Sequence, residues 1–293
     1  MKKTYFCTSD IHGYYDLFIE ALTREGFDKN NPSHILIVAG DIFDRGEQSL
    51  EVYNFLKSLP KERRILIRGN HEYLLRDLVA RKRPKSYDES NGTYGTLFQL
   101  ANIGYKKESE MIHDYYRDLA TNNEVGNPKS PVEIESKYAE LRKKLYIGKV
   151  QEVLDWIFSD EWVNYYELDN YIFVHSFIPT PIPWDLYSPT RGEPIYREDW
   201  RNATPTEWED ATWVCPWSYY KAGLFKPEEE KGKILVCGHW AAYDFKRHLG
   251  GKQFKRDKLD YSPYISKHLI ALDATTYASH KINIYKIEKE DAD

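Results

Sequence analysis

Three short polar segments each end a hydrophobic run with residues that could bind metal ions and phosphate. Residues 10–13 read DIHG, residues 40–46 read GDIFDRG and residues 69–72 read GNHE. Divalent ions of hard or borderline character prefer carboxylate oxygen and imidazole nitrogen as ligands. One such segment would be weak evidence. Three of them in this order, at intervals of about thirty residues, predict a phosphoesterase site that holds two metal ions.

Six residues are candidate metal ligands, and each lies at or just beyond the end of a predicted strand. They are Asp10, His12, Asp41, Asn70, His175 and His239. Asp41 is the natural bridging ligand, because it lies between the other ligand groups in the sequence. A bridging carboxylate can hold two ions ~3.5–4 Å apart, and such a pair lowers the pKa of a shared water. The ions would also neutralise the charge that develops on the phosphoryl oxygens.

Each candidate taken singly has a simpler explanation. An aspartate after a strand is often only a turn or a helix cap, and a histidine at a strand end, such as His175, is more often a hydrogen-bonded core residue. The joint occurrence reverses this judgement. Nearby glycines add weight, because a glycine lets backbone or substrate approach a ligand closely. These glycines are Gly13, Gly40, Gly46, Gly69 and Gly238.

Other catalytic schemes lack their sequence patterns. The chain has no G-x-S-x-G, no G-x-x-x-x-G-K-[ST] and no G-x-G-x-x-G after a strand. Cys7 and Cys237 lie inside apolar runs, so we expect them to be buried structural thiols. Together with Cys215 they form a sparse, odd set without a CxxC pair, which fits a reducing compartment rather than a disulfide framework.

Composition and charge are those of a water-soluble globular protein, with 41% apolar and 30% charged residues. The net charge of -5 gives no overall attraction to nucleic acid or to an anionic membrane. The first motif begins at residue 10, which leaves no room for a signal peptide. No stretch approaches the ~18 consecutive apolar residues of a membrane span. We therefore expect a cytoplasmic protein without a membrane partner.

The first 80 residues alternate between two hydrophobic periods. Near-continuous apolar runs predict buried parallel strands at residues 5–8, 34–39 and 64–68. Apolar residues at helical spacing predict helices between them, which stop at Gly26 and near Pro60. In such a βαβαβα arrangement ligands bind outside the carboxyl ends of the strands, and each of the three motifs lies at such an end.

The rest of the chain divides into a helical part, an aromatic part and a second set of strands. Residues 73–165 predict a helical insertion or cap within a single domain that spans residues 1–293, with helices at 111–119, 132–145 and 150–157. Strand patterns return at 171–175, 233–239, 268–273 and 281–287, and their alternation is closer to that of antiparallel strands.

The segment from about 177 to 230 is rich in aromatic residues and proline. Five of the eight tryptophans lie between Trp184 and Trp217, and we expect the prolines to break any regular structure there. The simpler interpretation is an aromatic loop packed onto the core. The alternative is a wall of the substrate cleft, because long irregular segments in compact domains are usually functional.

These motifs carry a resemblance to a known family. The segments SDIHG, GDIFDRG, RGNHE, VHS and CGHW resemble the signature of the calcineurin-like metallophosphoesterases. More narrowly, they resemble the phosphoprotein phosphatase branch of serine/threonine phosphatases and its bacterial and phage relatives. The resemblance spans residues 4 to about 287, apart from the insertion and the aromatic loop. It implies an α/β fold, a four-layer αββα sandwich of two mixed sheets flanked by helices.

The resemblance also implies a role for each site residue. His71 would be the general acid that protonates the leaving oxygen, while a metal-bridging hydroxide attacks the phosphate. Asp44 would pair with His71 and keep it protonated, since a nearby carboxylate raises the pKa of a histidine. Arg45 would bind a non-bridging phosphate oxygen with its planar fork, with Asn70 and His71 also at the substrate.

The same resemblance divides the ligands between two divalent ions. One ion would be held by Asp10, His12 and Asp41, and the other by Asp41, Asn70, His175 and His239. Mn²⁺ is the first expectation, and Fe and Zn are the alternatives, because all three accept a mixed nitrogen and oxygen ligand set.

Three departures from the family pattern bear on the substrate. Ser176 and Phe177 follow His175, where a small residue and glycine are usual, and Trp240 replaces the threonine of the usual G-H-T. A second phosphate-binding arginine in a W-x-R element has no counterpart, because residues 213–215 read WVC. The possible substitutes for it are Arg191, Arg197 and Arg201.

Three functions follow from these observations. The first is a metal-dependent phosphomonoesterase that acts on phosphoserine or phosphothreonine, because the intact D-R-G segment is shared with protein phosphatases. The second keeps the fold and changes the substrate to a nucleotide, a dinucleoside polyphosphate or an RNA-end phosphate. The third is a binding or regulatory protein that holds metal without turnover, and the complete set of ligands and the His71–Asp44 pair argue against it.

Overall fold

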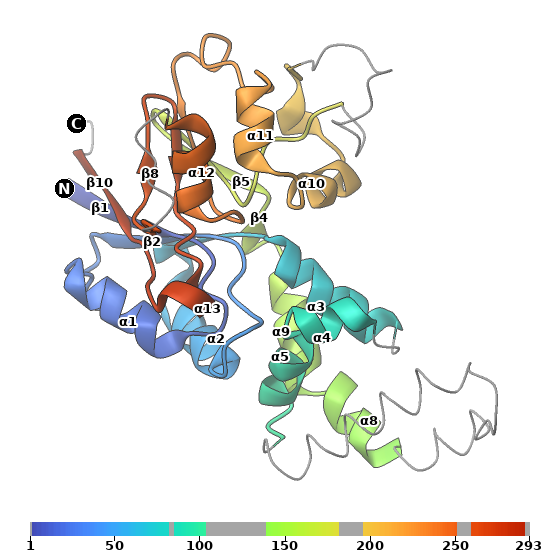
Figure 1. Ribbon diagram of the computed structural model, residues 1–293. Helices are drawn as coiled ribbons and strands as arrows, with labels where there is room; N and C mark the ends of the chain where they lie inside the picture. Colours follow the sequence, from blue (N-terminus) through green and yellow to red (C-terminus); the bar gives the residue numbers. More distant parts are fainter. Residues whose placement is uncertain (1, 82–84, 104–138, 182–195, 251–258, 291–293) are drawn as a thin grey trace.

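The computed structural model describes residues 2–81, 85–103, 139–181, 196–250 and 259–290 (Figure 1). Its first sheet has the strand order β10-β1-β2-β3-β4. The strands are β1 (Lys2–Thr8), β2 (His34–Ala39), β3 (Arg64–Ile67), β4 (Trp162–Val163) and β10 (Tyr285–Glu290). β1 to β4 run parallel, with Tyr5 opposite Ile35 and Ile37 opposite Ile65. The strands predicted at 5–8, 34–39 and 64–68 are therefore confirmed.

The second sheet has the strand order β5-β6-β7-β9-β8. Its strands are β5 (Tyr165–Leu168), β6 (Tyr171–Val174), β7 (Ile234–Cys237), β8 (Tyr264–Ile265) and β9 (Leu269–Ala271). The central strands β6, β7 and β9 are parallel, and only the edge strands β5 and β8 are antiparallel to their neighbours. The antiparallel prediction is therefore wrong for the centre of this sheet, whose strands are buried on both faces.

The last strand was predicted in the second set but belongs to the first sheet. β10 pairs antiparallel with β1, with Ile287 opposite Tyr5. Its alternation of exposed and buried residues is that of an edge strand with one face covered. That alternation carries no information about which sheet the strand joins.

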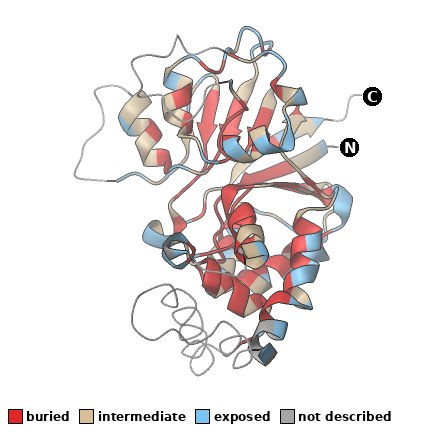
Figure 2. Ribbon diagram, turned by 90° about the vertical axis from the view of Figure 1, so that its right-hand side faces the viewer, coloured by how far each residue is buried: buried red, intermediate tan, exposed pale blue. Residues whose placement is uncertain are grey.

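The two sheets pack face to face, and helices cover their outer faces. Alternate residues of a strand point to opposite faces, so Tyr5 and Ile37 join Phe173 and Val236 in a cluster between the sheets. Phe6, Leu36 and Val38 instead pack against the helices of the first sheet. Figure 2 shows both sheets as largely buried. These layers confirm the predicted αββα sandwich.

The helices on the first sheet's side include two early ones and the predicted insertion. They are α1 (Tyr15–Arg24), α2 (Ser49–Ser58), η1 (Lys61–Arg63), α3 (Asn70–Arg81), α4 (Ser86–Ser90), α5 (Thr93–Leu100), α8 (Ala139–Tyr146) and α9 (Lys149–Ile157). α9 confirms the helix predicted at 150–157, and α8 confirms the described part of that at 132–145. The helix predicted at 111–119 lies outside the described residues. The division into one domain with an insertion stays a prediction.

The second sheet is covered by η2 (Trp200–Asn202), α10 (Pro205–Ala211), α11 (Pro216–Lys221) and α12 (Ala242–Leu249). The expectation that prolines break regular structure in this segment is wrong for residues 200–221. Pro205 and Pro216 each occupy the first turn of a helix, where the missing N–H had no partner anyway. Trp200 and Trp208 pack on Tyr165, as expected for an aromatic segment on the core. Trp184 and its neighbours at 182–195 lie outside the described residues.

A further short helix, α13 (Thr276–Ser279), follows β9. Among the described residues, every helix is too short or too polar to cross a lipid bilayer.

Candidate metal centre and active site

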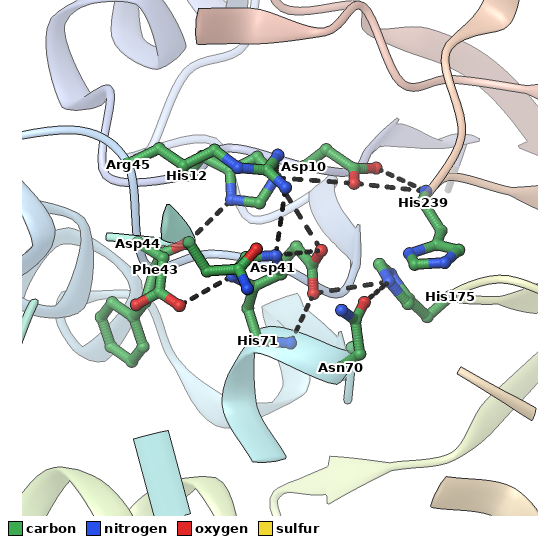
Figure 3. A network of polar contacts seen from close by, with 12 residues as sticks. Asp10, His12, Asp41, Phe43, Asp44, Arg45, Asn70, His71, His175 and His239 are labelled. Carbon is green, nitrogen blue, oxygen red and sulfur yellow. Dashed lines mark hydrogen bonds and ion pairs between the residues drawn. The ribbon is translucent and has the colours of Figure 1, made fainter. Parts of the chain in front are cut away.

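The carboxyl ends of strands from both sheets bring the six predicted ligands together (Figure 3). Asp10, Asp41 and Asn70 follow β1, β2 and β3, while His175 and His239 follow β6 and β7. Five of the six are at most 2% exposed, and His239 is half-buried. Residues separated by more than 200 positions in the sequence thus share one buried site.

Asp41 stands at the centre of this site. Its Oδ2 lies 3.8 Å from Nε2 of His12 and 3.8 Å from Nε2 of His71. Its Oδ1 lies 3.4 Å from Nε2 of His175. In the described part of the chain, two side-chain groups could each hold an ion, namely His12–Asp41–His71 and Asp41–His175–His239. Asp41 is common to both, which is the arrangement a bridging ligand requires.

Asp10 and Asn70 complete the set from opposite sides. Oδ1 of Asp10 lies 3.9 Å from Nε2 of His12, and both carboxylate oxygens of Asp10 accept a hydrogen bond from the backbone N–H of His239, at 3.2 and 3.0 Å. Oδ1 of Asn70 lies 2.8 Å from Nε2 of His175. The structure therefore brings all six candidates together, and it adds His71 to the group around His12.

Backbone carbonyls fix which nitrogen of His12 and of His175 faces the site. Nδ1 of His12 donates to the carbonyl of Phe43 at 2.9 Å, and Nδ1 of His175 donates to the carbonyl of Ala39 at 2.8 Å. A carbonyl can only accept, so the proton is on Nδ1 and the lone pair is on Nε2. Metal-binding histidines are typically oriented by such a hydrogen bond.

The protonation states also suit a cation. Burial lowers the pKa of His12 well below its usual range and lowers that of His175 to about 4, so both rings are neutral, as ligands must be. Burial raises the pKa values of Asp10 and Asp41 well above the usual range, and a neighbouring carboxylate raises each further: Asp273 for Asp10, and Asp10 for Asp41. Nearby positive charge would reverse that effect.

One positive group already lies among these side chains. Nη1 of Arg45 is 2.5 Å from Nε2 of His12, and Nη2 of Arg45 is 3.2 Å from Nε2 of His71. The guanidinium thus donates to the lone pair of the candidate ligand His12 and to the lone pair of His71. The carboxylate and imidazole donors, with their lone pairs facing the site, fit a site for divalent ions. The position of the Arg45 guanidinium among them shows that the site accommodates positive charge.

Asp44 and His71 form the predicted pair. Nδ1 of His71 donates to Oδ2 of Asp44 at 2.7 Å, and both side chains are buried. That Asp44 keeps His71 protonated stays a prediction, and in this arrangement burial opposes it. Burial lowers the pKa of His71 well below its usual range, and the positive charge of Arg45 lowers it further. Burial also raises the pKa of Asp44 to about 7.

The backbone at the site is held in an unfavourable conformation. Among the described residues, eleven non-glycine residues have positive φ, and six of them are site residues. These six are Asp10, His12, Asp41, Asp44, Arg45 and His239. A left-handed conformation costs an ordinary residue about 1–2 kcal/mol, and such strain concentrates at functional sites because the surrounding fold imposes it.

The glycines expected to permit close approach do so. A Cβ added to Gly40 would lie 2.7 Å from Cα of Gly69 and 2.8 Å from its nitrogen. One added to Gly238 would overlap Asp10 and Ser9. These glycines let the ends of neighbouring strands come close enough for their ligands to meet.

We expect Gly40→Ala to be about 1–3 kcal/mol more destabilising than Gly26→Ala, because the added methyl overpacks the gap between the ends of β2 and β3. The two glycines have nearly the same φ, +83° and +82°, but Gly26 has no atom within 4 Å of an added Cβ. Both variants carry the same backbone strain. The difference between their stabilities therefore measures the clash of the added methyl group with Gly69.

The Gly40→Ala substitution should also displace Asp41. We therefore expect the hydrolysis rate of this variant to be about 10²-fold lower, the order of loss that a misplacement of about an ångström causes. Denaturant unfolding and metal-dependent hydrolysis would measure both effects. Equal stability and activity of the two variants would contradict this account.

Sequence reasoning gave no role to Glu72, although it belongs to the GNHE segment. Its buried carboxylate accepts hydrogen bonds from the backbone N–H groups of Asp41, Ile42 and Gly69, at 3.0, 3.0 and 2.7 Å. Glu72 therefore ties the loop after β2 to the start of α3. Its place in the motif was the only available signal.

Thr93 and Thr96 were also missed. Both hydroxyls donate to the carboxylate of Asp44, at 2.8 and 2.7 Å. Nothing in the sequence points to them, because they lie in the predicted insertion about fifty residues from Asp44.

The departures from the family pattern have different structural consequences. Phe177 is 1% exposed and packs in the core of the second sheet, so it does not shape an open substrate site. Trp240 is 37% exposed, and its ring centroid lies 6.5 Å from that of the candidate ligand His239. Of these two replacements, only Trp240 therefore presents an exposed ring beside a candidate ligand.

Of the three arginines proposed as a second phosphate-binding residue, two form ion pairs with acidic side chains and one lies outside the described residues. Arg197 pairs with Asp199 and Glu207. Arg201 pairs with Glu167 and Glu230, the latter at 2.6 Å. Arg191 lies outside the described residues.

The fold and donor set are those of a known family. Residues 4–243 match the family model described as calcineurin-like phosphoesterase, and the chain belongs to this family. The family assignment made from the motifs is therefore confirmed, and membership implies divalent metal ions.

Among curated proteins, the chain is similar to the symmetrical bis(5'-nucleosyl)-tetraphosphatase of Buchnera aphidicola subsp. Schizaphis graminum. The two are 31% identical over 166 residues, 55% of this chain and 59% of the relative. The corresponding protein of Buchnera aphidicola subsp. Acyrthosiphon pisum (strain Tuc7) is 45% identical over 70 residues, 24% of each chain. The chain thus spans less than two thirds of the length of these relatives.

Similar solved structures include two phosphatases. The cold-active protein-tyrosine phosphatase of a psychrophilic Shewanella species is 14% identical, with a TM-score of 0.48, over 99% of this chain and 76% of that one. A protein serine/threonine phosphatase from Saccharomyces cerevisiae is 15% identical, with a TM-score of 0.42, over 92% of this chain and 66% of that one.

Proposed function

We propose that this protein is a metal-dependent phosphoesterase. The observation that carries the proposal is the position of Asp41 in both candidate ion-binding groups. One ion would be held by Asp10, His12 and Asp41, and the other by Asp41, Asn70, His175 and His239. When bound, two such ions supply the positive charge that activates the attacking water and stabilises the phosphoryl oxygens.

Arg45 and His71 would act on the substrate itself. The Arg45 fork can bind two oxygens of one phosphate, and it already points into the site toward His12 and His71. His71, oriented through Nδ1 by Asp44, presents Nε2 to the same place. That atom would give its proton to the leaving oxygen.

Arg45 also accounts for how His71 could gain that proton. In the described arrangement Arg45 donates to Nε2 of His71, so that nitrogen has no proton to give. A bound phosphate would attract the guanidinium away from the ring and add negative charge beside it. Both changes raise the pKa of His71, so the general acid becomes protonated when substrate binds.

Exposed aromatic rings at the site favour a substrate that carries a nucleobase. Trp240 is 37% exposed, and Tyr277 is 53% exposed. Trp240 adjoins His239, and the Tyr277 ring lies 5.4 Å from the Arg45 guanidinium. Base stacking on such a ring contributes about 1–3 kcal/mol. The names of the curated relatives point the same way. Phosphoserine and phosphothreonine are the competing substrates, supported by the D-R-G segment.

Steady-state kinetics with Mn²⁺ would separate these classes. The panel is a dinucleoside tetraphosphate, an aryl monophosphate and a phosphoserine peptide. We expect the dinucleotide to have the highest kcat/KM. We expect Trp240→Ala and Tyr277→Ala each to lower that value about 10-fold, with less than about twofold effect on the peptide.

Tyr87→Ala is the matched control for the aromatic variants, because Tyr87 is also exposed, at 38%, but lies on α4. Preference for the peptide would instead indicate a protein phosphatase. No metal-dependent hydrolysis of any substrate would favour the non-catalytic, metal-binding protein.

A further inference from the structure

Helix α5, in the predicted insertion, packs against the loop that carries Asp44 and Arg45. Thr93, Thr96 and Gln99 recur every three residues, so they lie on one face of the helix. All three bind the segment between Asp44 and Ser49. A helix far from the metal-binding motifs in sequence therefore contacts the loop on which the substrate-binding and acid–base residues lie.

The two threonines account for both oxygens of the Asp44 carboxylate. Thr93 Oγ1 donates to Oδ2 at 2.8 Å, and Thr96 Oγ1 donates to Oδ1 at 2.7 Å. The Thr96 hydroxyl also accepts the backbone N–H of Asp44 at 2.9 Å. Thr93, Thr96 and Asp44 are all 0% exposed. Water does not reach this side of the carboxylate, so no solvent molecule can replace a lost hydroxyl.

The rest of the same helix face holds the remainder of the loop. Gln99 Nε2 donates to the carbonyl of Gly46 at 2.9 Å, and Gln99 Oε1 accepts the backbone N–H of Ser49 at 2.6 Å. At the start of the helix, a Cβ on Gly92 would lie 2.9 Å from Cα of Arg45. The helix and the loop are thus packed without space for an intervening side chain.

These contacts determine how Asp44 can act on His71. Two hydroxyls and Nδ1 of His71 direct three donors at one carboxylate, and an ionised carboxylate is an acceptor only. Its plane is fixed by partners on both oxygens. His71 must then carry its proton on Nδ1 and turn Nε2 toward Arg45 and Asp41.

We infer that α5 is the positioning element of the Asp44–His71 pair, and that Thr93 and Thr96 are the positioning residues through which it acts. The inference rests on the proposed function, in which His71 is the general acid. The predicted insertion is then part of the catalytic apparatus, because it sets the tautomer and the direction of that acid.

The test uses Thr93→Val and Thr96→Val, which remove a hydroxyl and keep the shape. Each should lower kcat about 10-fold, the worth of one buried hydrogen bond, with KM changed less than about twofold and Mn²⁺ content unchanged. Thr93→Ser and Thr96→Ser should restore most of kcat. Thr212→Val is the matched control, because the buried Thr212 hydroxyl donates only to the Glu209 carbonyl, at 2.6 Å, at the end of α10.

Two further measurements separate positioning from a merely structural role. In a His71→Asn background, Thr96→Val should cause no additional loss, because residues that act through one group are not additive. In metal-free protein, ¹⁵N NMR of the imidazoles should show His71 protonated on Nδ1. In the Thr93→Val/Thr96→Val double variant it should show mixed tautomers.

Unchanged kcat and tautomer in folded valine variants would overturn the inference, as would an equal loss in the His71→Asn background. Absent hydrolysis by the unmodified protein would instead overturn the proposed function. The NMR result would still decide whether α5 fixes His71.

Discussion

Asp41→Asn is expected to remove at least one metal ion from the protein and to lower hydrolysis by about 10³-fold or more. An asparagine can keep Oδ1 as the acceptor of the His71 backbone N–H, which lies at 3.0 Å. Its amide nitrogen would then take the place of Oδ2, which faces His12 and His71 at 3.8 Å. A neutral donor there removes negative charge from both ion sites, and each ion contributes several kcal/mol to the transition state.

The experiment compares metal content by elemental analysis after loading with Mn²⁺, together with the rate on the preferred substrate. Asp169→Asn is a matched control. Asp169 is also an aspartate with positive φ, 46° against 55° for Asp41, but it lies in the exposed turn between β5 and β6. A normal metal content in Asp41→Asn would contradict the bridging role.

His71→Asn is expected to lower the rate by about 10²–10⁴-fold, the typical share of general acid catalysis, while metal is retained. The loss should depend on the leaving group. The leaving group of an alkyl phosphate is a strongly basic alkoxide, which needs the proton. The leaving group of a nitrophenyl phosphate is a stable anion that needs the proton far less, so hydrolysis of this substrate should slow by a smaller factor.

Metal content decides between two roles for His71, because its Nε2 also stands in one candidate ion-binding group with His12 and Asp41. If His71 is a ligand, the asparagine variant should lose an ion, and the loss in rate should be the same for both leaving groups. His280→Asn is the control, since His280 is exposed and has a left-handed backbone that asparagine tolerates.

Much of the site could be predicted from the sequence because most of its candidate residues lie in a few short motifs. Asp10, Asp41 and Asn70 each come directly after a strand whose near-continuous apolar run marks burial on both faces. Parallel strands end at the same edge of a sheet, so these residues could be expected to meet. His175 and His239 follow the same logic on the second sheet. The same runs and the helical periods between them indicate only the βαβαβα arrangement, and the four-layer fold was implied by the resemblance of the motifs to a known family.

The errors fall where partners are distant in the sequence. The alternation of β10 indicates an edge strand, but its pairing with β1 depends on how the whole chain returns to the first sheet. Phe177 comes two residues after the candidate ligand His175, yet its side chain packs in the core. Arg197 and Arg201 were candidates for phosphate binding, and the acidic side chains that engage them lie on other elements.

Local spacing and hydrophobic period were enough to predict which residues are candidates for metal and phosphate chemistry and at which strand ends they lie. The electrostatic state of those residues, and the side chains that hold them in place, became visible only in the folded chain. Burial and Arg45 lower the pKa of His71 against the effect expected of Asp44. The hydroxyls that hold Asp44 come from α5, about fifty residues away. Desolvation and long-range packing have no local signature, so they emerge only when the chain has folded.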